Sequence, residues 1–258
     1  MYNLHLETSH FPAQTDTEIR DISVGGLLRE IASSHPDSIA MVDVAEDGNC
    51  GQSWTYSDLA NQAKSLAQAL ASRFEPRERI VVWAPNIPEW IFMEYAAGLA
   101  GLVLVTANPS FQTAELRYVL DQSDAVGLFM IDEFRGNPMK EIANEATKGN
   151  TRLRETVNLH SKDTLFKIGD RPTLLPNVHP DDPAQIQYTS GTTGFPKGAV
   201  LSHKNLVNNA RLFCARKQVN QHSVWANFMP LFHTAGCATG ALGCLQAACK
   251  MLLIKRFD

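Results

Sequence analysis

Hydrophobic patterns typical of helices and of strands alternate along most of the chain. Leu59, Ala63, Leu66 and Leu70 recur at spacings of four, three and four residues, which predicts an amphipathic helix over 57–73. Short runs rich in β-branched and other apolar residues predict strands at 79–84, 102–106 and 125–131. Helices and strands therefore alternate, and this pattern is typical of parallel βαβ units with right-handed crossovers.

Local signals mark where several of the helices begin. Thr55 and Asp58 have the spacing of a capping box, which would start the first of these helices. Pro88 favours the first turn of a second helix that continues to Ala100. A third helix is expected from about Ala114 to Gln122.

The pattern fades between residues 133 and 182, where we expect a variable connection with one helix and a short strand near 155–160. Its last part contains closely spaced prolines, which exclude a continuous helix or central strand: Pro172, Pro176, Pro180 and Pro183. We therefore expect layered αβα subdomains with mostly parallel sheets. Residues 1–182 would form the first α/β subdomain, and 183–258 would begin the second.

The second part of the chain starts with a strand of period two. Ala184, Ile186 and Tyr188 alternate with two glutamines, which predicts an apolar buried strand before a loop. Ser202 then has the place of a helix cap. The final apolar run, 250–255, is expected to lack neighbouring strands and to promote aggregation.

Composition narrows the classes of function. Hydrophobic residues make up 44% and charged residues 19% of the 258 positions, as in ordinary globular proteins. The net charge of -4, without a long basic run, argues against nucleic acid or an anionic membrane as partner. No secretory signal is evident at the start, and the longest uncharged stretch is too short in its apolar part to span a bilayer. We leave self-association open.

The five cysteines are an odd number without a CxxC pair, so a reduced, cytoplasmic protein is the simpler expectation. Cys237, Cys244 and Cys249 follow His233, which raises a metal site as an alternative. Zinc motifs normally have closer ligand pairs, so we favour small apolar residues on a helix over 235–249.

The densest chemistry is in "YTSGTTGFPKG", residues 188–198. Glycines permit positive φ and close backbone approach, hydroxyl groups donate hydrogen bonds, and successive amides form an anion-binding nest beside Lys197. The stretch is neither a common P-loop nor a GxGxxG fingerprint. Composition alone leaves phosphate binding and an ordinary turn equally open.

These eleven positions resemble the phosphate-loop signature of the adenylate-forming superfamily. "LSHKNL", "MPLFHTAG" and "ANPSFQTAELRYVLDQS" extend the similarity from about Val24 to Asp258. The "LFH" and "NPSF" features are most similar to fatty and medium-chain acyl-CoA synthetases. A third possibility, a kinase-like phosphate-loop enzyme, is disfavoured because the Walker pattern is absent.

The resemblance implies that a carboxylic acid reacts with ATP to give an acyl-adenylate, whose acyl group then passes to coenzyme A. Phosphate-holding residues would be Thr189, Ser190, Gly191, Thr192, Thr193, Gly194 and Lys197. Lys197 would also offset charge on the departing pyrophosphate. A threonine hydroxyl would ligate Mg2+, with Thr192 as our candidate and Thr193 as the alternative.

Two further roles follow from the same resemblance. His233 would orient the carboxylate or adenylate at the entrance of the acid site, and Arg256 would lie near the path of coenzyme A. The alternatives are a histidine in a plain turn and a solvated arginine.

Relatives of this type continue with a Tyr-Gly-x-Thr-Glu stretch, a ribose-binding aspartate and a mobile C-terminal domain, and the 258 residues contain no such motifs. The chain therefore resembles the N-terminal portion of such an enzyme. We expect no acid-dependent ATP–pyrophosphate exchange from it alone. The alternative is a non-catalytic nucleotide-binding fragment or interaction remnant.

Overall fold

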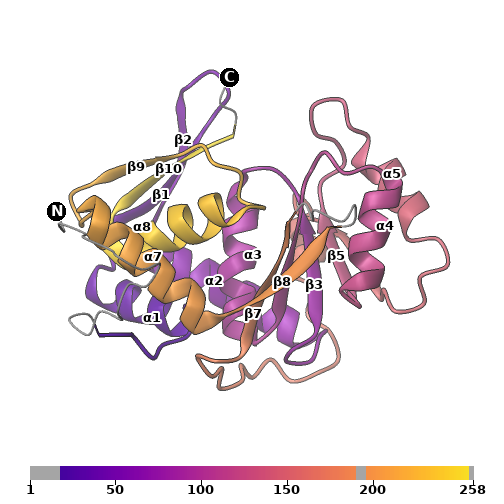
Figure 1. The fold of residues 1–258 in the computed structure, drawn as a ribbon, viewed down its shortest axis with the longest axis horizontal. Helices are drawn as coiled ribbons and strands as arrows, with labels where there is room; N and C mark the ends of the chain where they lie inside the picture. Colours follow the sequence, from indigo (N-terminus) through magenta and orange to yellow (C-terminus); the bar gives the residue numbers. More distant parts are fainter. Residues whose placement is uncertain (1–17, 190–195, 256–258) are drawn as a thin grey trace, which may run out of the picture.

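Two β-sheets and the helices packed on them form the described part of the protein (Figure 1). The computed structural model describes residues 18–189 and 196–255. Adjacent strands are parallel except for the pairs β1–β2 and β7–β8. The expected α/β class with mostly parallel sheets is therefore confirmed.

The larger sheet has six strands in the order β6-β5-β3-β4-β7-β8, and the smaller has four in the order β2-β1-β10-β9. The strands of the larger sheet are β3 Arg79–Trp83, β4 Val103–Ala107, β5 Gly127–Met130, β6 Glu155–Asn158, β7 Pro183–Thr189 and β8 Lys197–Ser202. Those of the smaller sheet are β1 Ile39–Val44, β2 Cys50–Thr55, β9 Val224–Asn227 and β10 Lys250–Ile254.

The helices of the described residues are α1 Val24–Ser34, α2 Tyr56–Ala71, α3 Pro88–Ala100, α4 Thr113–Gln122, α5 Met139–Ala146, α6 Lys162–Leu165, α7 His203–Lys217, the π-helix η1 Ala235–Leu242 and α8 Gly243–Ala247. In this part of the chain, no helix combines the length and apolar character needed to cross a bilayer. In Figure 1, α4 and α5 lie beside the six-stranded sheet, and α7 and α8 lie beside the four-stranded sheet.

Helix starts follow the local signals of the sequence. At α2, the side chain of Thr55 accepts from the amide of Asp58 at 3.1 Å, and the Asp58 carboxylate accepts from the amide of Thr55 at 3.0 Å. Ser202 forms a similar capping box with Asn205 at α7. Pro88 begins α3, which ends at Gly101 with a φ of 67°, where a glycine avoids the strain of the left-handed region.

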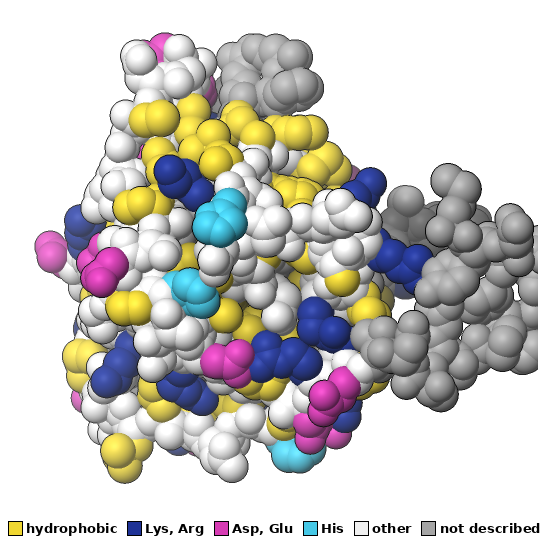
Figure 2. Space-filling model, turned by 90° about the vertical axis from the view of Figure 1, so that its left-hand side faces the viewer, with side chains coloured by type: hydrophobic (Ala, Val, Ile, Leu, Met, Phe, Trp, Pro, Cys, Tyr) yellow, Lys and Arg dark blue, Asp and Glu magenta, His cyan; other side chains and the backbone are white. Residues whose placement is uncertain are grey.

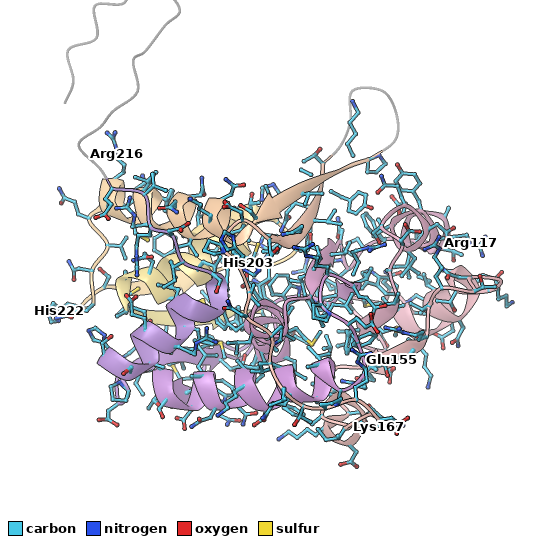
Figure 3. The ribbon with its side chains drawn as sticks, turned by 90° about the horizontal axis from the view of Figure 1, so that it is seen from below. Arg117, Glu155, Lys167, His203, Arg216 and His222 are labelled. Carbon is cyan, nitrogen blue, oxygen red and sulfur yellow. The ribbon has the colours of Figure 1, made fainter. Side chains whose placement is uncertain are left out.

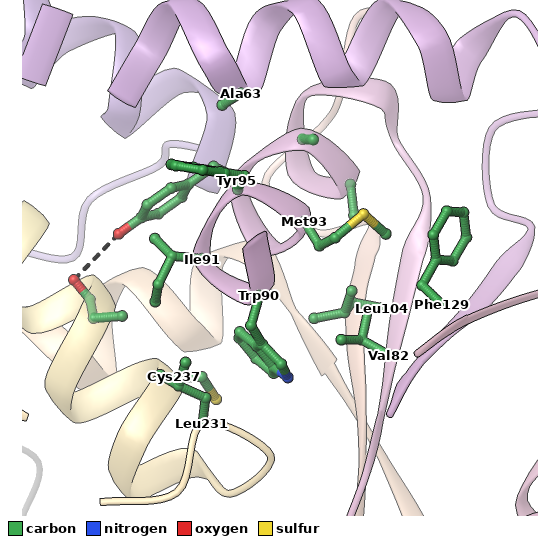
Figure 4. Close-up of a cluster of buried hydrophobic side chains, with 14 of the residues drawn as sticks. Ala63, Val82, Trp90, Ile91, Met93, Tyr95, Leu104, Phe129, Leu231 and Cys237 are labelled. Carbon is green, nitrogen blue, oxygen red and sulfur yellow. Dashed lines mark hydrogen bonds between the residues drawn. The ribbon is translucent and has the colours of Figure 1, made fainter. Parts of the chain in front are cut away.

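Helix α3 has almost no solvent-facing side. Every one of its residues except Glu89 is buried, and in Figure 1 the helix lies between the two sheets. Figure 4 shows its side chains reaching Leu104 and Phe129 on one side and Cys237 on the other. Its Tyr95 hydroxyl donates to the carbonyl of Ala241 in η1 at 3.2 Å. The helix is thus part of the hydrophobic core that lies between the two sheets.

The expected boundary at residue 182 does not separate the two sheets. Strands β7 and β8 follow that boundary but join the sheet of β3–β6, whereas β9 and β10 join β1 and β2. Each sheet therefore takes strands from both sides of residue 182. Residues 166–182 contain no helix or strand, as the prolines predicted.

The buried side chains of β7 differ from the expected ones, because both glutamines lie inside and only Ala184 of the three apolar residues is buried. Gln185 and Gln187 are only 2% and 5% exposed, whereas Ile186 and Tyr188 are half-buried. The glutamine amides find hydrogen-bond partners in the interior, which offsets the cost of removing them from water. The alternation had the correct period, but it did not say which face lies inside.

The expectation that the last apolar run lacks neighbours was wrong. β10 lies between β1 and β9 and pairs with both in parallel. Met251 and Leu253 are buried, so this strand is an inner strand of the sheet. The edge strand beside β10 is β9. Large apolar side chains at or just after β9 are exposed: Val224, Phe228 and Met229. On the face in Figure 2, apolar side chains gather in the upper part.

His203, at the start of α7, lies in the interior of the fold, whereas His222 lies at its periphery (Figure 3). The Nδ1 of His203 accepts from the amide of Val24 at 3.4 Å, and the Nε2 of His203 has no partner among the described residues. Burial lowers the pKa of His203 from its usual 6.5 to about 4. The folded protein therefore holds this imidazole neutral.

We predict that His203 makes the protein less stable in mild acid. Between pH 6.5 and 4, His203 is protonated in the unfolded state and neutral in the folded state. The free energy of unfolding therefore decreases as the pH decreases through this window. The loss is about 1.4 kcal/mol per pH unit. Denaturant unfolding at several pH values should show a shallower acid slope for His203→Asn than for the wild type. The exposed His222→Asn is the control, and an identical slope in all three proteins would contradict the prediction.

Candidate functional site

The strands β7 and β8 form an antiparallel pair whose connection is the glycine- and threonine-rich stretch. Thr189 and Lys197 face each other in the register, and the Thr189 hydroxyl donates to the Lys197 carbonyl at 3.5 Å. Both residues are exposed. The backbone pairing thus brings the two ends of the stretch together and leaves the Lys197 ammonium group accessible. The other predicted members of this site lie outside the described residues: Ser190, Gly191, Thr192, Thr193, Gly194 and Arg256.

Helix α4 holds both arms of this hairpin. The Tyr118 hydroxyl donates to the carbonyl of Pro196 at 2.9 Å, next to Lys197. One helical turn later, Gln122 accepts from the hydroxyl of Tyr188. The two tyrosine rings meet edge to face with centroids 6.4 Å apart. Burial raises the pKa of Tyr188 to about 12, so its hydroxyl remains a neutral donor.

His233 lies in the turn between β9 and η1 and is exposed. The amide of Ala235 donates to its Nδ1 at 3.2 Å, which assigns the proton of the neutral ring to Nε2. The turn is tight, since a Cβ at Gly236 would lie 2.2 Å from the carbonyl oxygen of Pro230. His233 therefore presents an N–H donor from a turn that only glycine permits.

Asn86 fixes the segment in front of His233, and no sequence pattern predicted this role. Its Nδ2 donates to the carbonyls of Met229 and Ile254, both at 3.1 Å, and its Oδ1 accepts from the amide of Leu231 at 2.9 Å. The side chain is 5% exposed. One buried amide thus joins the loop after β3 to the His233 turn and to the end of β10.

A cavity of about 510 Å³ is lined by residues of β8, α7 and η1. Leu201 of β8 and Thr234, which follows His233, both line it. Most of the remaining wall comes from α7, which contributes the apolar Leu206 and Leu212 and also the polar Lys204, Asn205, Asn208 and Asn209. Lys204, at the rim, pairs with Asp21 at 2.9 Å. An apolar group of moderate size fits this cavity.

A second cavity, of about 320 Å³, lies beyond the carboxyl ends of β3 and β4. Its lining includes the cationic side chains of Arg135 and Lys255 and the aromatic ring of Phe134. Lys255 also pairs with Asp43 at 3.2 Å. Crevices at this edge of a parallel sheet are common ligand sites, and the charges here suit an anion.

The thiols considered as metal ligands lie in the interior. Cys237 and Cys249 are fully buried, and burial raises the pKa of the Cys237 thiol well above its usual range. Within residues 18–189 and 196–255, no group of three or more His, Cys, Asp or Glu side chains is arranged to hold a metal ion. Our metal candidate, Thr192, lies outside these ranges.

The family model for AMP-binding enzymes matches residues 28–258, which is most of the chain and includes the hairpin and the His233 turn. The chain belongs to this family. The resemblance to adenylate-forming enzymes is thereby confirmed.

Known relatives of this AMP-binding chain include acyl-CoA ligases. The mitochondrial medium-chain acyl-CoA ligase ACSF2 of Homo sapiens is 29% identical over 95% of this chain and 44% of its own length. The acyl-CoA ligase SID4 of Ajellomyces capsulatus is 28% identical over 96% of this chain and 44% of its own. The chain spans less than half the length of these relatives.

Solved structures show the same fold. The apo structure of MbtA from Mycobacterium smegmatis superposes with a TM-score of 0.80 at 24% identity, over 92% of this chain and 44% of that one. At this identity the likeness concerns the fold alone.

We predict that Tyr118→Phe loosens the hairpin without unfolding the protein. The variant keeps the ring but loses the hydrogen bond to Pro196, which contributes about 1 kcal/mol. Hydrogen exchange of the backbone amides of Lys197 and Gly198 should become about fivefold faster.

The matched control is Tyr56→Phe, because that hydroxyl donates to the carbonyls of Cys244 and Cys249 and not to the hairpin. It should lower overall stability and leave the amides of Lys197 and Gly198 no more exposed than those of the rest of the chain. Equal local effects in both variants would refute the role of Tyr118.

Proposed function

We propose that this chain is part of an ATP-dependent acid–CoA ligase that forms an acyl-adenylate and then an acyl-CoA. The family match carries the proposal, and the hairpin that places Lys197 opposite Thr189 supports it. The acid is a small-molecule carboxylate, and we propose a cytoplasmic location. Self-association stays an open expectation.

Lys197 would act on the phosphates of ATP. Its ammonium group is exposed beside a segment whose amides and hydroxyls are hydrogen-bond donors, so it suits a group of high negative charge. Charge grows on the pyrophosphate as it leaves, and a fixed cation stabilises that charge more than it stabilises bound ATP. Mg2+, when bound, would supply further positive charge, and Thr192 is the residue that we assign to it.

His233 would hold the acid. The Nε2 proton can donate to a carboxylate oxygen, and the Ala235 amide fixes the ring for that purpose. The cavity beside Thr234 would take the apolar tail of the acid. The leucines of its wall, Leu201, Leu206 and Leu212, would contact an alkyl or aryl chain.

Coenzyme A would approach from the edge where the second cavity lies. Arg135 and Lys255 line that cavity and would attract its phosphates. Arg256, which follows Lys255 in sequence, keeps its proposed role near the same path.

The alternative function is a non-catalytic one, in which the chain binds nucleotide phosphates or is an interaction remnant. The hairpin that places Lys197 opposite Thr189 would serve phosphate binding without catalysis as well. ATP binding without acid-dependent exchange, in the longest polypeptide that carries this segment, would favour it.

We predict that Lys197→Ala slows adenylate formation in a polypeptide with the complete active site. The loss should be about 100-fold in acid-dependent ATP–pyrophosphate exchange, as for removal of one charge-stabilising group. Lys217→Ala, at the far end of α7, is the control and should exchange normally. An unchanged rate in Lys197→Ala would remove this residue from the mechanism.

We also predict that Leu212→Trp shortens the acids that are accepted. The larger side chain would fill part of the 510 Å³ cavity, and each methylene group that is excluded costs about 0.8 kcal/mol. The kcat/KM for the longest good substrate should fall by tenfold or more, while that for short acids changes little. Leu174→Trp makes the same change at a side chain that is 84% exposed. A uniform loss over all acids would count against the cavity as the acid site.

A further inference from the structure

A chain of buried polar side chains crosses the core behind the hairpin. The Thr106 hydroxyl donates to the side-chain oxygen Oε1 of Gln187 at 3.2 Å, and Nε2 of Gln187 donates to Oε1 of Gln185 at 3.0 Å. The Gln185 amide donates to Oε1 of Glu94 at 2.7 Å. Gln187 also reaches the sulfur of Cys237 at 3.3 Å. All five side chains are at most 5% exposed.

The chain joins four elements that surround the candidate site. Thr106 belongs to β4, the two glutamines to β7, Glu94 to α3 and Cys237 to η1. β7 leads directly into the phosphate-binding hairpin, and η1 follows the His233 turn. A π-helix is rare, and its wide turns are often found at functional sites. The polar chain is therefore a direct link between the two halves of the site.

Glu94 is the end of this chain, and it is held as a neutral acid. Its Oε2 is buried and has no partner among the described residues. Complete burial raises its pKa from the usual 4.5 to about 8, and only the hydrogen bond from Gln185 opposes this shift. The titratable neighbours, Tyr95 and Cys237, are uncharged, because burial raises their own pKa values.

The donors in the chain all point towards Glu94, and such a row of hydrogen bonds is mutually strengthening. A neutral carboxyl accepts the Gln185 amide without placing a charge in the core. An ionised carboxylate there would have no cationic partner in the part of the chain that the structure describes, which is costly in a dry interior.

We propose that Glu94 is a positioning residue that, as a protonated acid, fixes the strand of the phosphate hairpin against the helix of the His233 turn. Both substrates would bind to their own elements without it, but the reacting atoms would no longer be aligned. The kinetic part of this inference rests on the proposed ligase function. The structural part does not.

The first test is the pH dependence of unfolding, with Glu94→Gln as the variant. An unfolded glutamate ionises near 4.5 and the folded Glu94 near 8, so only the folded state keeps the proton between these values. The ratio of folded to unfolded protein should therefore fall about tenfold per pH unit as the pH rises through this window. Glu94→Gln keeps the acceptor but cannot ionise, so this component should vanish.

Glu89→Gln is the matched control, since it makes the same change on the same helix at a side chain that is not buried. It should keep the slope of the wild type. If Glu94→Gln keeps that slope as well, Glu94 is not a buried neutral acid and the proposal fails.

The second test locates the coupling by hydrogen exchange. Glu94→Leu fills the space but offers no acceptor to Gln185, so amides in β7 and η1 should exchange faster, while those in β5 and β6 stay protected. Glu94→Gln should restore protection in β7 and η1. Faster exchange spread evenly over the whole chain would show a purely structural role and overturn the proposal.

The third test measures acid-dependent ATP–pyrophosphate exchange in the polypeptide with the complete site. At pH 7, Glu94→Leu should lower kcat about tenfold and change the KM values for ATP and acid by less than about twofold, because binding survives and alignment does not. Glu94→Gln should restore kcat. The wild-type rate should decrease above about pH 8 as Glu94 ionises, and Glu94→Gln should lack this decrease.

The failures of the two proposals are distinguishable. An unmutated enzyme without any exchange would overturn the ligase function, and the unfolding and hydrogen-exchange results would still decide the role of Glu94. An active enzyme in which Glu94→Leu keeps its kcat would overturn the positioning role alone.

Discussion

The burial of α3 on all sides is the constraint on which the rest of the fold depends. A helix without a solvent-facing side needs apolar partners around its whole circumference, and neither sheet alone can supply them. Both sheets and η1 therefore pack on it, with the Tyr95 hydroxyl joining helix and π-helix. Because strands from both ends of the chain are needed to complete the two sheets, the fold forms only when distant segments meet.

The candidate site lies on this frame and takes its geometry from side chains outside it. Tyr118 and Gln122 hold the hairpin from α4, and Asn86 holds the His233 turn from the loop after β3. Chemistry that depends on aligned phosphates and carboxylates gains more from such fixed supports than from the reacting groups alone. The exposed Lys197 and His233 thus depend on neighbouring side chains, among them the half-buried Tyr118 and the buried Asn86, for their positions.

The sequence predicted elements whose signals are local. The starts of α2 and α3 were predicted correctly, because the capping pair Thr55 and Asp58 and the proline of α3 each act within one helical turn. The inward face of β7 could not be predicted, since a period of two is the same for either face. Gln185 can lie inside only because Glu94, far away in sequence, accepts its hydrogen bond.

The same reason explains the other differences between expectation and structure. The neighbours of β10 are β1 and β9, and no local pattern could name strands that distant. For the candidate site, the glycines and hydroxyls indicated a phosphate loop, but the bonds of Asn86 join positions more than a hundred residues apart. A lone asparagine after a proline carries no sign of such bonds.

The register between Thr189 and Lys197 also bears on how this protein can evolve. Antiparallel pairing fixes both ends of the connecting segment, so the span that the segment must close is set by the sheet and not by the segment itself. Substitutions there alter the chemistry presented to a ligand, whereas an insertion or deletion must be absorbed entirely within the span. As proteins that descend from this chain diverge, amino-acid substitutions in the segment should therefore be accepted far more readily than insertions or deletions.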